Sequence, residues 1–388
     1  MSDIVYLDHA ATTPVDKEVL EAMLPYLTDK FGSASTLYSI GREAREAVEE
    51  ARIRVARLIN ARPEEIYFTG GGSECDNWAI FGVAAAKAQK GKHIITCKIE
   101  HHAVLEPVHT LEKQGYTATV LGVDENGFVS VDELESSITD GTVLITIMHA
   151  NNEVGTIEPV EEIGAIAKAR GIHFHTDTVQ TVGHIPVDVE KIGCDSLAIS
   201  GHKLYGPKGV GAMYIRKGSR VEKLLRGGGQ ENNRRAGTHN VPGIVGLGKA
   251  AELAEVRMAS EAERTTRLRD SLIAGIEANI VDVKLNGDRV KRLPNNVNFS
   301  FDGVEGESMI LLMDMNGICV SSGSACTSGS LDPSHVLMAL GLKHEQAHGS
   351  LRMTLGKDNT EADIQKVLDV LPGIVKRLRE MSPLYAGK

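Results

Sequence analysis

Between about Glu64 and Arg216, the sequence alternates short apolar segments with longer segments of helical spacing. Segments such as "EIYFT", "VLITIM" and "DSLAIS" have the length and composition of buried strands. Strands separated by helices form right-handed βαβ units, which place the strands side by side and parallel with helices over both faces. The alternation therefore predicts an α/β protein built on a mostly parallel sheet.

Polar residues follow several of these predicted strands. Ligands of open parallel sheets bind beyond the carboxyl ends of the strands, where such residues gather. The residues at those ends are Ser73, His101, Asn152, Asp177 and Lys203. We therefore expect the functional site at this edge of the sheet.

The chain has 388 residues, which exceeds one core of ordinary size and indicates two domains. A long helical stretch around Ile244–Asn279 leads into further strand-like and helix-like segments. We expect a large domain over residues 15–255, and a smaller α+β domain formed by residues 1–14 and 256–388.

The net charge of -10 argues against nucleic acid as a partner. The N-terminal sequence lacks the apolar region of a signal peptide, and no apolar run approaches the roughly 18–20 residues of a membrane span. We therefore expect a cytoplasmic protein that binds no membrane. The five cysteines are scattered without CxxC spacing, so neither a disulfide framework nor a zinc site is indicated.

Lys203 follows an apolar strand in "AISGHKLYGPKG". It is either an ordinary surface charge or a lysine that forms a Schiff base. The second role requires a cofactor such as pyridoxal phosphate, with an acid at the ring nitrogen and a phosphate site. Asp177 ends the preceding strand, and "TGGGSE" leads into a helix N-terminus, which favours phosphate. The order of these three elements indicates a pyridoxal-phosphate enzyme.

Cys326 lies in "VSSGSACTSGSLDPSH", where almost no apolar side chain could bury it. A buried thiol behaves as a small hydrophobe, whereas an accessible one can act as a nucleophile. Small residues offer little to anchor the segment. We expect a mobile loop over about Ser324 to Pro333, with Cys326 exposed on it.

Further motifs extend along nearly the whole chain, including "YLDHAATTP", "EHHAVLEP", "MHANNEVGTI", "HTDTVQTVGHIPVDV", "GGGQENNRRAGTHNVPGIVG" and "SSGSACTSGSLDPSH". Together they resemble the cysteine desulfurases of the NifS/IscS type, which are pyridoxal-phosphate enzymes of fold type I. The resemblance implies a large domain with a mostly parallel, seven-stranded sheet between helices, followed by a smaller α+β C-terminal domain.

The resemblance also implies a role for each matching residue. Lys203 would bind the cofactor covalently, His101 would stack on its ring, and Asp177 would face the ring nitrogen. The ring hydroxyl and the substrate side would be contacted by Gln180 and Asn152. The phosphate would be bound by Gly72, Ser73, Ser200 and His202, and by Thr238 of the partner subunit in a homodimer.

For the reaction, the resemblance implies that Arg352 binds the carboxylate of L-cysteine bidentately, as guanidinium geometry allows. Cys326 would be the nucleophile that takes the sulfur and becomes a persulfide, while the substrate leaves as L-alanine. The sulfur would pass to an acceptor such as an iron–sulfur scaffold protein. No resident metal is implied, although Cys326 could transiently ligate an iron–sulfur cluster.

Some segments depart from the family pattern. Ser33-Ala34 stand where Asn-Pro is usual, Tyr38 where His is usual, and Gly72-Ser73 where Ala-Thr is common. The serine retains a hydroxyl for phosphate, whereas the Tyr38 change leaves the role of that position open.

Other functions remain open from the sequence. Selenocysteine lyase and a related aminotransferase use the same cofactor. A metal-binding scaffold could instead use Cys326 with His173 and His175, because an HxH pair on a strand places both rings on one face. The sulfur acceptor could serve general iron–sulfur assembly, nitrogenase maturation or tRNA thiolation.

Overall fold

The structure is a computed structural model that describes residues 4–322, 333–382 and 385. Cys326 and nearly all of the predicted Ser324–Pro333 loop lie outside the described residues. Within the described part of the chain, no helix is long and apolar enough to cross a membrane.

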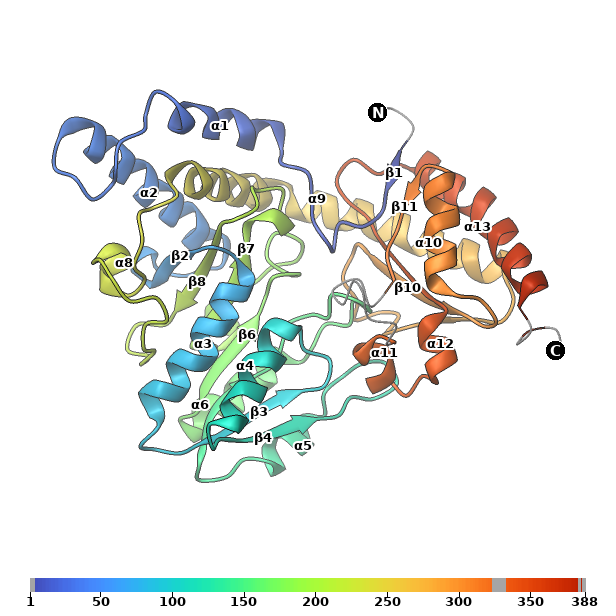
Figure 1. Cartoon of the computed structure of the whole chain (residues 1–388), viewed down its shortest axis with the longest axis horizontal. Coiled ribbons are helices and arrows are strands. Elements are labelled where there is room, and N and C mark those ends of the chain that lie inside the picture. The colour runs from blue at the N-terminus through green and yellow to red at the C-terminus, as the bar shows by residue number, and fades with distance from the viewer. Residues whose placement is uncertain (1–3, 323–332, 383–384, 386–388) are drawn as a thin grey trace.

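A seven-stranded sheet forms the centre of the larger part of the molecule (Figure 1). Its strand order is β2-β8-β7-β6-β5-β3-β4. All pairs from β4 across to β7 are parallel, whereas β8 runs opposite to both of its neighbours. The prediction of a mostly parallel sheet is therefore confirmed. The strands are β2 (Ile66–Thr69), β3 (His93–Cys97), β4 (Thr117–Leu121), β5 (Thr142–Thr146), β6 (His173–Asp177), β7 (Ser196–Ser200) and β8 (Gly211–Ile215).

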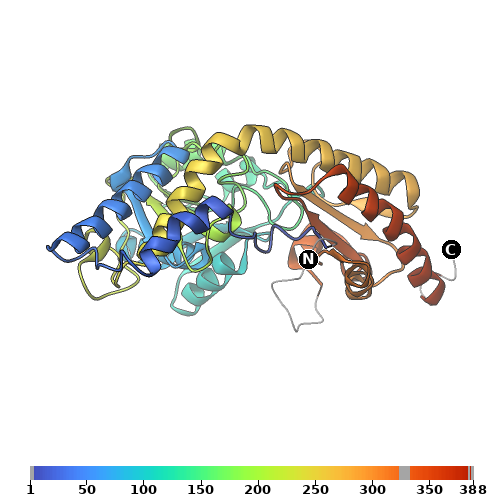
Figure 2. The same ribbon diagram turned by 90° about the horizontal axis from the view of Figure 1, so that it is seen from above.

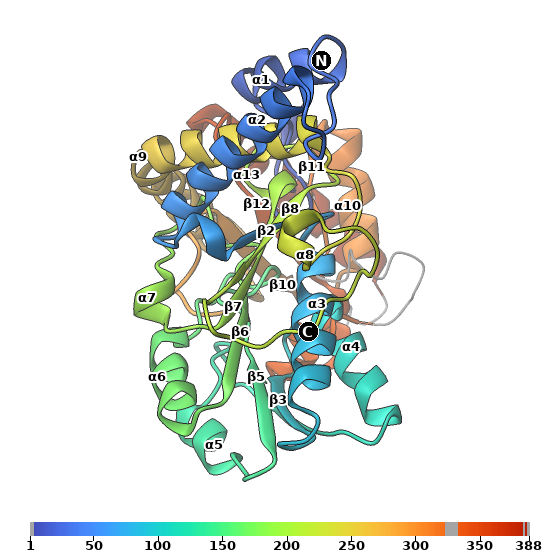
Figure 3. The same cartoon turned by 90° about the vertical axis from the view of Figure 1, so that its left-hand side faces the viewer.

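Helices cover both faces of this sheet (Figure 3). The helices α3 (Gly72–Lys87) and α4 (His102–Lys113) pack on one face. The other face is covered by α2 (Ser39–Leu58), α6 (Val160–Arg170) and the first half of α9 (Val241–Asn279), against which α1 (Lys17–Leu27) packs.

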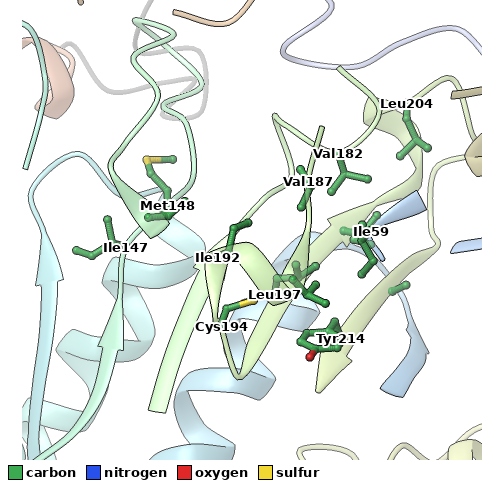
Figure 4. Packing of buried hydrophobic residues seen from close by; sticks show 14 of the residues in the cluster. Ile59, Ile147, Met148, Val182, Val187, Ile192, Cys194, Leu197, Leu204 and Tyr214 are labelled. Carbon is green, nitrogen blue, oxygen red and sulfur yellow. The ribbon is translucent and has the colours of Figure 1, made fainter. Parts of the chain in front are cut away.

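Successive side chains along each strand point to opposite faces of the sheet, so each strand contributes apolar side chains to the cores on both faces. Ile94 of β3 packs with α3 and α4, whereas the next residue, Ile95, belongs to the core on the opposite face. In that core, Leu197 of β7 and Tyr214 of β8 lie near Ile59 at the end of α2 (Figure 4). Burial on both faces explains why these strands are almost continuously apolar.

The smaller part of the molecule contains a three-stranded antiparallel sheet of order β12-β10-β9. These strands are β9 (Val283–Leu285), β10 (Asn296–Phe301) and β12 (Ser350–Thr354). A parallel pair, β1 (Val5–Tyr6) and β11 (Ile318–Cys319), brings the N-terminal segment to this part. The helices α10 (Gly306–Met315) and α13 (Glu361–Met381) complete its separate hydrophobic core.

The 39-residue helix α9 joins the two parts (Figure 2). Ile244 and Leu247 near its start belong to the larger core, whereas Leu272 and Ile276 near its end belong to the smaller one. Shorter elements connect the rest: α5 (Val131–Ser136), α7 (Val189–Ile192), α8 (Gln230–Asn233), α11 (His335–Ala339), α12 (His344–His348), and the 3-10 turns η1 (Pro63–Glu65) and η2 (Gly201–Lys203).

Candidate active site

A pocket of about 700 Å³ opens at the carboxyl ends of the parallel strands. Its lining brings together ten of the twelve residues predicted for the site. They are Gly72, Ser73, His101, Asn152, Asp177, Gln180, Ser200, His202, Lys203 and Arg352. Since these residues come from separate segments, their convergence is a property of the fold.

Lys203 lies in η2, immediately after β7. Its Nζ donates hydrogen bonds to the backbone oxygens of Ala10 and Ala11, at 2.5 and 2.8 Å. Gln180 Nε2 also donates to the Ala10 oxygen, at 3.0 Å. The N-terminal segment thus helps to hold the lysine amine inside the pocket.

Asp177 ends β6 and is only 7% exposed. Its Oδ1 accepts a hydrogen bond from the backbone N–H of Val179 at 2.8 Å. Burial, assisted by the nearby charge of Asp76, raises the pKa of Asp177 to about 7, while His101 acts in the opposite direction. A buried carboxyl group of this kind fits a cationic partner such as a protonated ring nitrogen.

The glycine turn before α3 forms the part of the pocket suited to a phosphate. Gly71 has φ +151° with extended ψ, a conformation that favours glycine. A Cβ on Gly72 would lie 2.6 Å from the Val179 side chain, so this position also requires a small residue. The free N–H groups of the α3 N-terminus and the Ser73 hydroxyl provide donors for an anion.

His101 caps the N-terminus of α4, where its Nδ1 accepts a hydrogen bond from the Ala103 N–H at 3.0 Å. This bond leaves the proton of a neutral imidazole on Nε2. Burial lowers the pKa of His101, with Asp177 opposing and Lys203 reinforcing the effect. His101 is therefore a neutral, flat ring inside the pocket near neutral pH.

Arg352 lies on β12 of the smaller part and is 2% exposed. Its Nη2 pairs with Asp8 Oδ1 at 2.9 Å, and its Nη1 donates to the backbone oxygen of Asn152 at 3.1 Å. Its buried Nε has no hydrogen-bond partner among the described residues. The guanidinium group thus retains a donor for an anionic ligand, although Asp8 already occupies one of its sides.

Two predicted residues are not part of the pocket as described. Thr238 is exposed, on the segment between α8 and α9. Cys326 lies outside the described residues, but both ends of its segment lie beside the site. Ser321 exchanges backbone hydrogen bonds with Arg352 at 2.7 and 3.1 Å, and the Ser334 hydroxyl donates to Glu153 at 2.5 Å.

The sequence interpretation missed other residues that line the pocket, including Asp76, Met148 and Lys208. It also assigned no role to Asp8, the partner of Arg352, which lies in the quoted "YLDHAATTP" motif. A polar residue inside that motif was the available signal for Asp8. Asp76 gave a weaker signal, as an acidic residue on the otherwise apolar face of a helix.

Comparison with known proteins gives the family. Residues 5–367 match the aminotransferase class-V family. The cysteine desulfurase IscS of Clostridium botulinum strain Hall is 57% identical over 387 residues, covering 99% of this chain and 98% of that protein. The chain belongs to the class-V aminotransferases, among the cysteine desulfurases.

Solved structures of this family have the same architecture. A NifS-like protein superposes with a TM-score of 0.89 at 38% identity, covering 97% of this chain and 99% of that one. The structure described as SspA in complex with cysteine gives a TM-score of 0.81 at 37% identity, covering 90% and 98%. The predicted fold type of this cysteine desulfurase is thereby confirmed.

Proposed function

We propose that this cysteine desulfurase binds pyridoxal 5′-phosphate at Lys203, releases L-alanine from L-cysteine, and carries the sulfur as a persulfide on Cys326. The observation that carries the proposal is the convergence of Lys203, Asp177 and the α3 N-terminus in one pocket. The relatives named as desulfurases, and the neighbour solved with cysteine, support the choice of substrate.

Besides Lys203, the pocket fits the cofactor at two points. Asp177 is a buried carboxyl group that lines the pocket, and it would face the ring nitrogen. The N-terminus of α3 would bind the phosphate with the Ser73 and Ser200 hydroxyls and His202. When bound, the cofactor supplies an electron sink that weakens bonds to the substrate carbons.

The protein residues would then act on the substrate. Arg352 would bind its carboxylate, and the Lys203 amine would take and return a proton at its α-carbon. His101 would lie flat against the ring, with its Nε2–H available as a proton donor, and Asn152 and Gln180 would contact the ring hydroxyl and the substrate.

Cys326 would attack the substrate sulfur as a thiolate. An S–S bond forms as the Cβ–S bond breaks, and the carbon skeleton takes up protons and leaves as alanine. The hydrogen bonds of Ser321 and Ser334 support this role, because they hold the described flanks of the Cys326 segment next to Arg352 and Glu153.

We propose a homodimer in which Thr238 reaches the phosphate bound by the partner subunit. Exposed apolar side chains on α1 and the following segment support an interface between two copies, because monomers rarely expose them in such number. Phe31 is 73% exposed and Leu37 81%, and both follow Leu24 and Leu27 of α1, which are also exposed. Tyr38, at 57%, would lie in the same interface.

The sulfur acceptor would be a protein such as an iron–sulfur scaffold, in keeping with the name IscS of the relative. The chain's net charge of -10 supports a protein acceptor over nucleic acid.

A cytoplasmic location stays a prediction. The two hydrophobic cores support a large domain over residues 15–255 and a small domain made of residues 1–14 and 256–388.

Reduction with borohydride and substitution of the lysine test the proposal together. Purified protein is expected to be yellow, and borohydride should bleach it and attach the cofactor irreversibly to a peptide containing Lys203. The Lys203→Ala variant should lose this attachment and all alanine production from L-cysteine. Attachment to another lysine, or alanine production by the variant, would contradict the assignment.

A further inference from the structure

The strand β6 carries a row of titratable side chains on one face. His173, His175 and Asp177 alternate along the strand, so all three point to the same side of the sheet. Asp76 of α3 lies against that side, and Ser196 of β7 pairs in register with His175. Only Asp177 of this row has a place in the proposed chemistry.

Four of these side chains form a continuous hydrogen-bonded chain. His173 Nε2 lies 2.8 Å from Ser196 Oγ, and Ser196 Oγ lies 3.0 Å from His175 Nδ1. His175 Nε2 lies 3.1 Å from Asp76 Oδ1. None of the four residues is more than 1% exposed.

The two ends of this chain open into different cavities. Asp76 lines the pocket of about 700 Å³ that contains Asp177 and Lys203. His173 lines a hollow of about 450 Å³ at the opposite end of β6, together with Lys87 and Asp195. The chain therefore links the candidate active site to a second surface through the interior of the protein.

The hydrogen bonds of the chain can run in either of two directions. Burial lowers the pKa of His175 to about 4 and that of His173 to about 3, so both imidazoles are neutral near pH 7. A neutral imidazole has one donor and one acceptor nitrogen, and a hydroxyl donates one hydrogen. If Asp76 is ionised, every donor points toward it; if Asp76 carries a proton on Oδ1, which faces His175, every donor points away.

We infer that Asp76, His175, Ser196 and His173 form a relay that carries one proton between the hollow beside His173 and the cofactor pocket. A proton that binds His173 Nδ1 displaces the Nε2 proton to Ser196. The Ser196 proton passes to His175 Nδ1, and the His175 Nε2 proton passes to Asp76. One proton enters at His173 and one proton arrives at Asp76, and the direction of every hydrogen bond in the chain is then reversed.

The relay would set the charge next to Asp177, a role that rests on the proposed function. Burial raises the pKa of Asp76 to about 8 and that of Asp177 to about 7, and the charge of Asp76 adds to the rise at Asp177. A proton on Asp76 removes a neighbouring negative charge and thereby favours an ionised Asp177. Asp76 is thus a positioning residue that acts through Asp177 on the ring nitrogen.

Other titratable groups also face the relay and belong in its proton balance. Glu100 and Cys75 lie near Asp76, Asp177 and His101 face the pocket end, and Asp195 and Lys87 face His173. At the pocket end, Asp76 is 1% and Asp177 7% exposed, and both reach solvent only through the pocket that they line. A ligand in the pocket would reduce that access, which leaves the strand interior as the route for protons.

The relay is tested with the cofactor-loaded protein and variants that interrupt the chain at different points. Ser196→Ala removes the central hydroxyl with little change of shape, and His173→Phe interrupts the outer end far from the pocket. Thr146→Val is the matched control, because it removes a buried hydroxyl of β5 that has no partner among the described residues. The readout is the cofactor absorbance after a rapid pH jump in a stopped-flow instrument.

Both relay variants should respond about tenfold more slowly than the unmutated protein, because the loss of a positioned proton carrier typically costs that much or more. The Thr146→Val control should respond at the unmutated rate, and Ser196→Thr, which restores a hydroxyl, should recover most of it. Equal rates in all five proteins would overturn the relay while leaving the proposed function intact. Failure of the unmutated protein to acquire the cofactor band would overturn both.

Discussion

The buried ion pair between Glu231 and Arg52 should provide a measurable part of the stability of the larger part of the molecule. Glu231 of α8 receives four hydrogen bonds: two from Arg52 at 2.8 and 2.9 Å, one from the Phe68 N–H at 2.8 Å, and one from His239 at 2.7 Å. Its side chain is 2% exposed and that of Arg52 7%. Glu231→Gln retains the shape but removes the charge.

Two estimates of the effect agree. Loss of one partner of a buried ion pair typically lowers the free energy of unfolding by about 3–5 kcal/mol. Burial opposes the ionisation of Glu231, but Arg52 and His239 outweigh it and lower the pKa of Glu231 from 4.5 to about 2. At about 1.4 kcal/mol for each pKa unit, that depression corresponds to roughly 3 kcal/mol.

The same shift predicts how the effect depends on pH. A carboxyl group with a depressed pKa in the folded state stabilises the protein fully above its unfolded pKa of 4.5, and this contribution is lost as the pH falls toward 2. The difference between the unmutated protein and Glu231→Gln should therefore be about 3 kcal/mol at pH 7, and it should shrink steadily below pH 5.

Urea unfolding followed by tryptophan fluorescence measures this difference. Trp78 is the only tryptophan, is 1% exposed, and packs on Tyr67 within the larger part of the molecule. The control is Glu190→Gln, because Glu190 pairs with Arg216 at the surface, where such pairs contribute about 1 kcal/mol or less. Equal unfolding free energies for the two variants at pH 7, or a difference independent of pH, would refute the reasoning.

Three further predictions concern the site. Arg352→Lys should lower kcat/KM for L-cysteine about a hundredfold, because an ammonium cannot bind a carboxylate bidentately while also holding Asp8; steady-state kinetics would show this, and an unchanged KM would contradict it. Cys326→Ser should still change the cofactor spectrum on addition of L-cysteine but release no alanine, so undiminished alanine in an amino-acid assay would assign the attack to another group. Mixed Lys203→Ala and Thr238→Ala subunits should form heterodimers in which one site carries both substitutions and the other neither; activity regained on mixing supports the shared site, and none regained excludes it.

The strands and helices of the large sheet were predictable because the pattern that indicates each one lies within its own segment of the sequence. Strands buried on both faces are apolar throughout, and the helices between them show helical spacing, so the β5 and β6 segments could be identified alone. The order of the strands depends on contacts between distant segments, which periodicity does not contain. The pairing of β8 with β2 is of this kind, since it joins segments that lie far apart in the sequence.

The site residues at strand ends were predictable for the same reason. Asp177 and Lys203 each follow an apolar strand, and parallel strands bring such residues to one edge. The pairing of Arg352 with Asp8 was not predictable, because residues 344 positions apart meet only through β12 and the N-terminal segment.

The pair His173 and His175 has one feature that the sequence predicted and one that it could not predict. Their position on one face of β6 follows from strand geometry and was predicted. Their bridging by the Ser196 hydroxyl depends on the neighbouring strand, and it occupies the nitrogens that a metal site would use. Among the described residues, no group of three His, Cys, Asp or Glu side chains could hold a metal ion.

The helix α9 has a mechanical consequence for the site. At 1.5 Å per residue, its 39 residues span roughly 60 Å, and its two halves are anchored in different cores. Lys203 belongs to one of the bodies that it joins and Arg352 to the other. The helix therefore acts as a spacer that, together with the contacts of Arg352 to Asn152 and Asp8, sets the separation of the amine and the guanidinium group. The length of substrate that can touch both thus depends in part on residues outside the pocket.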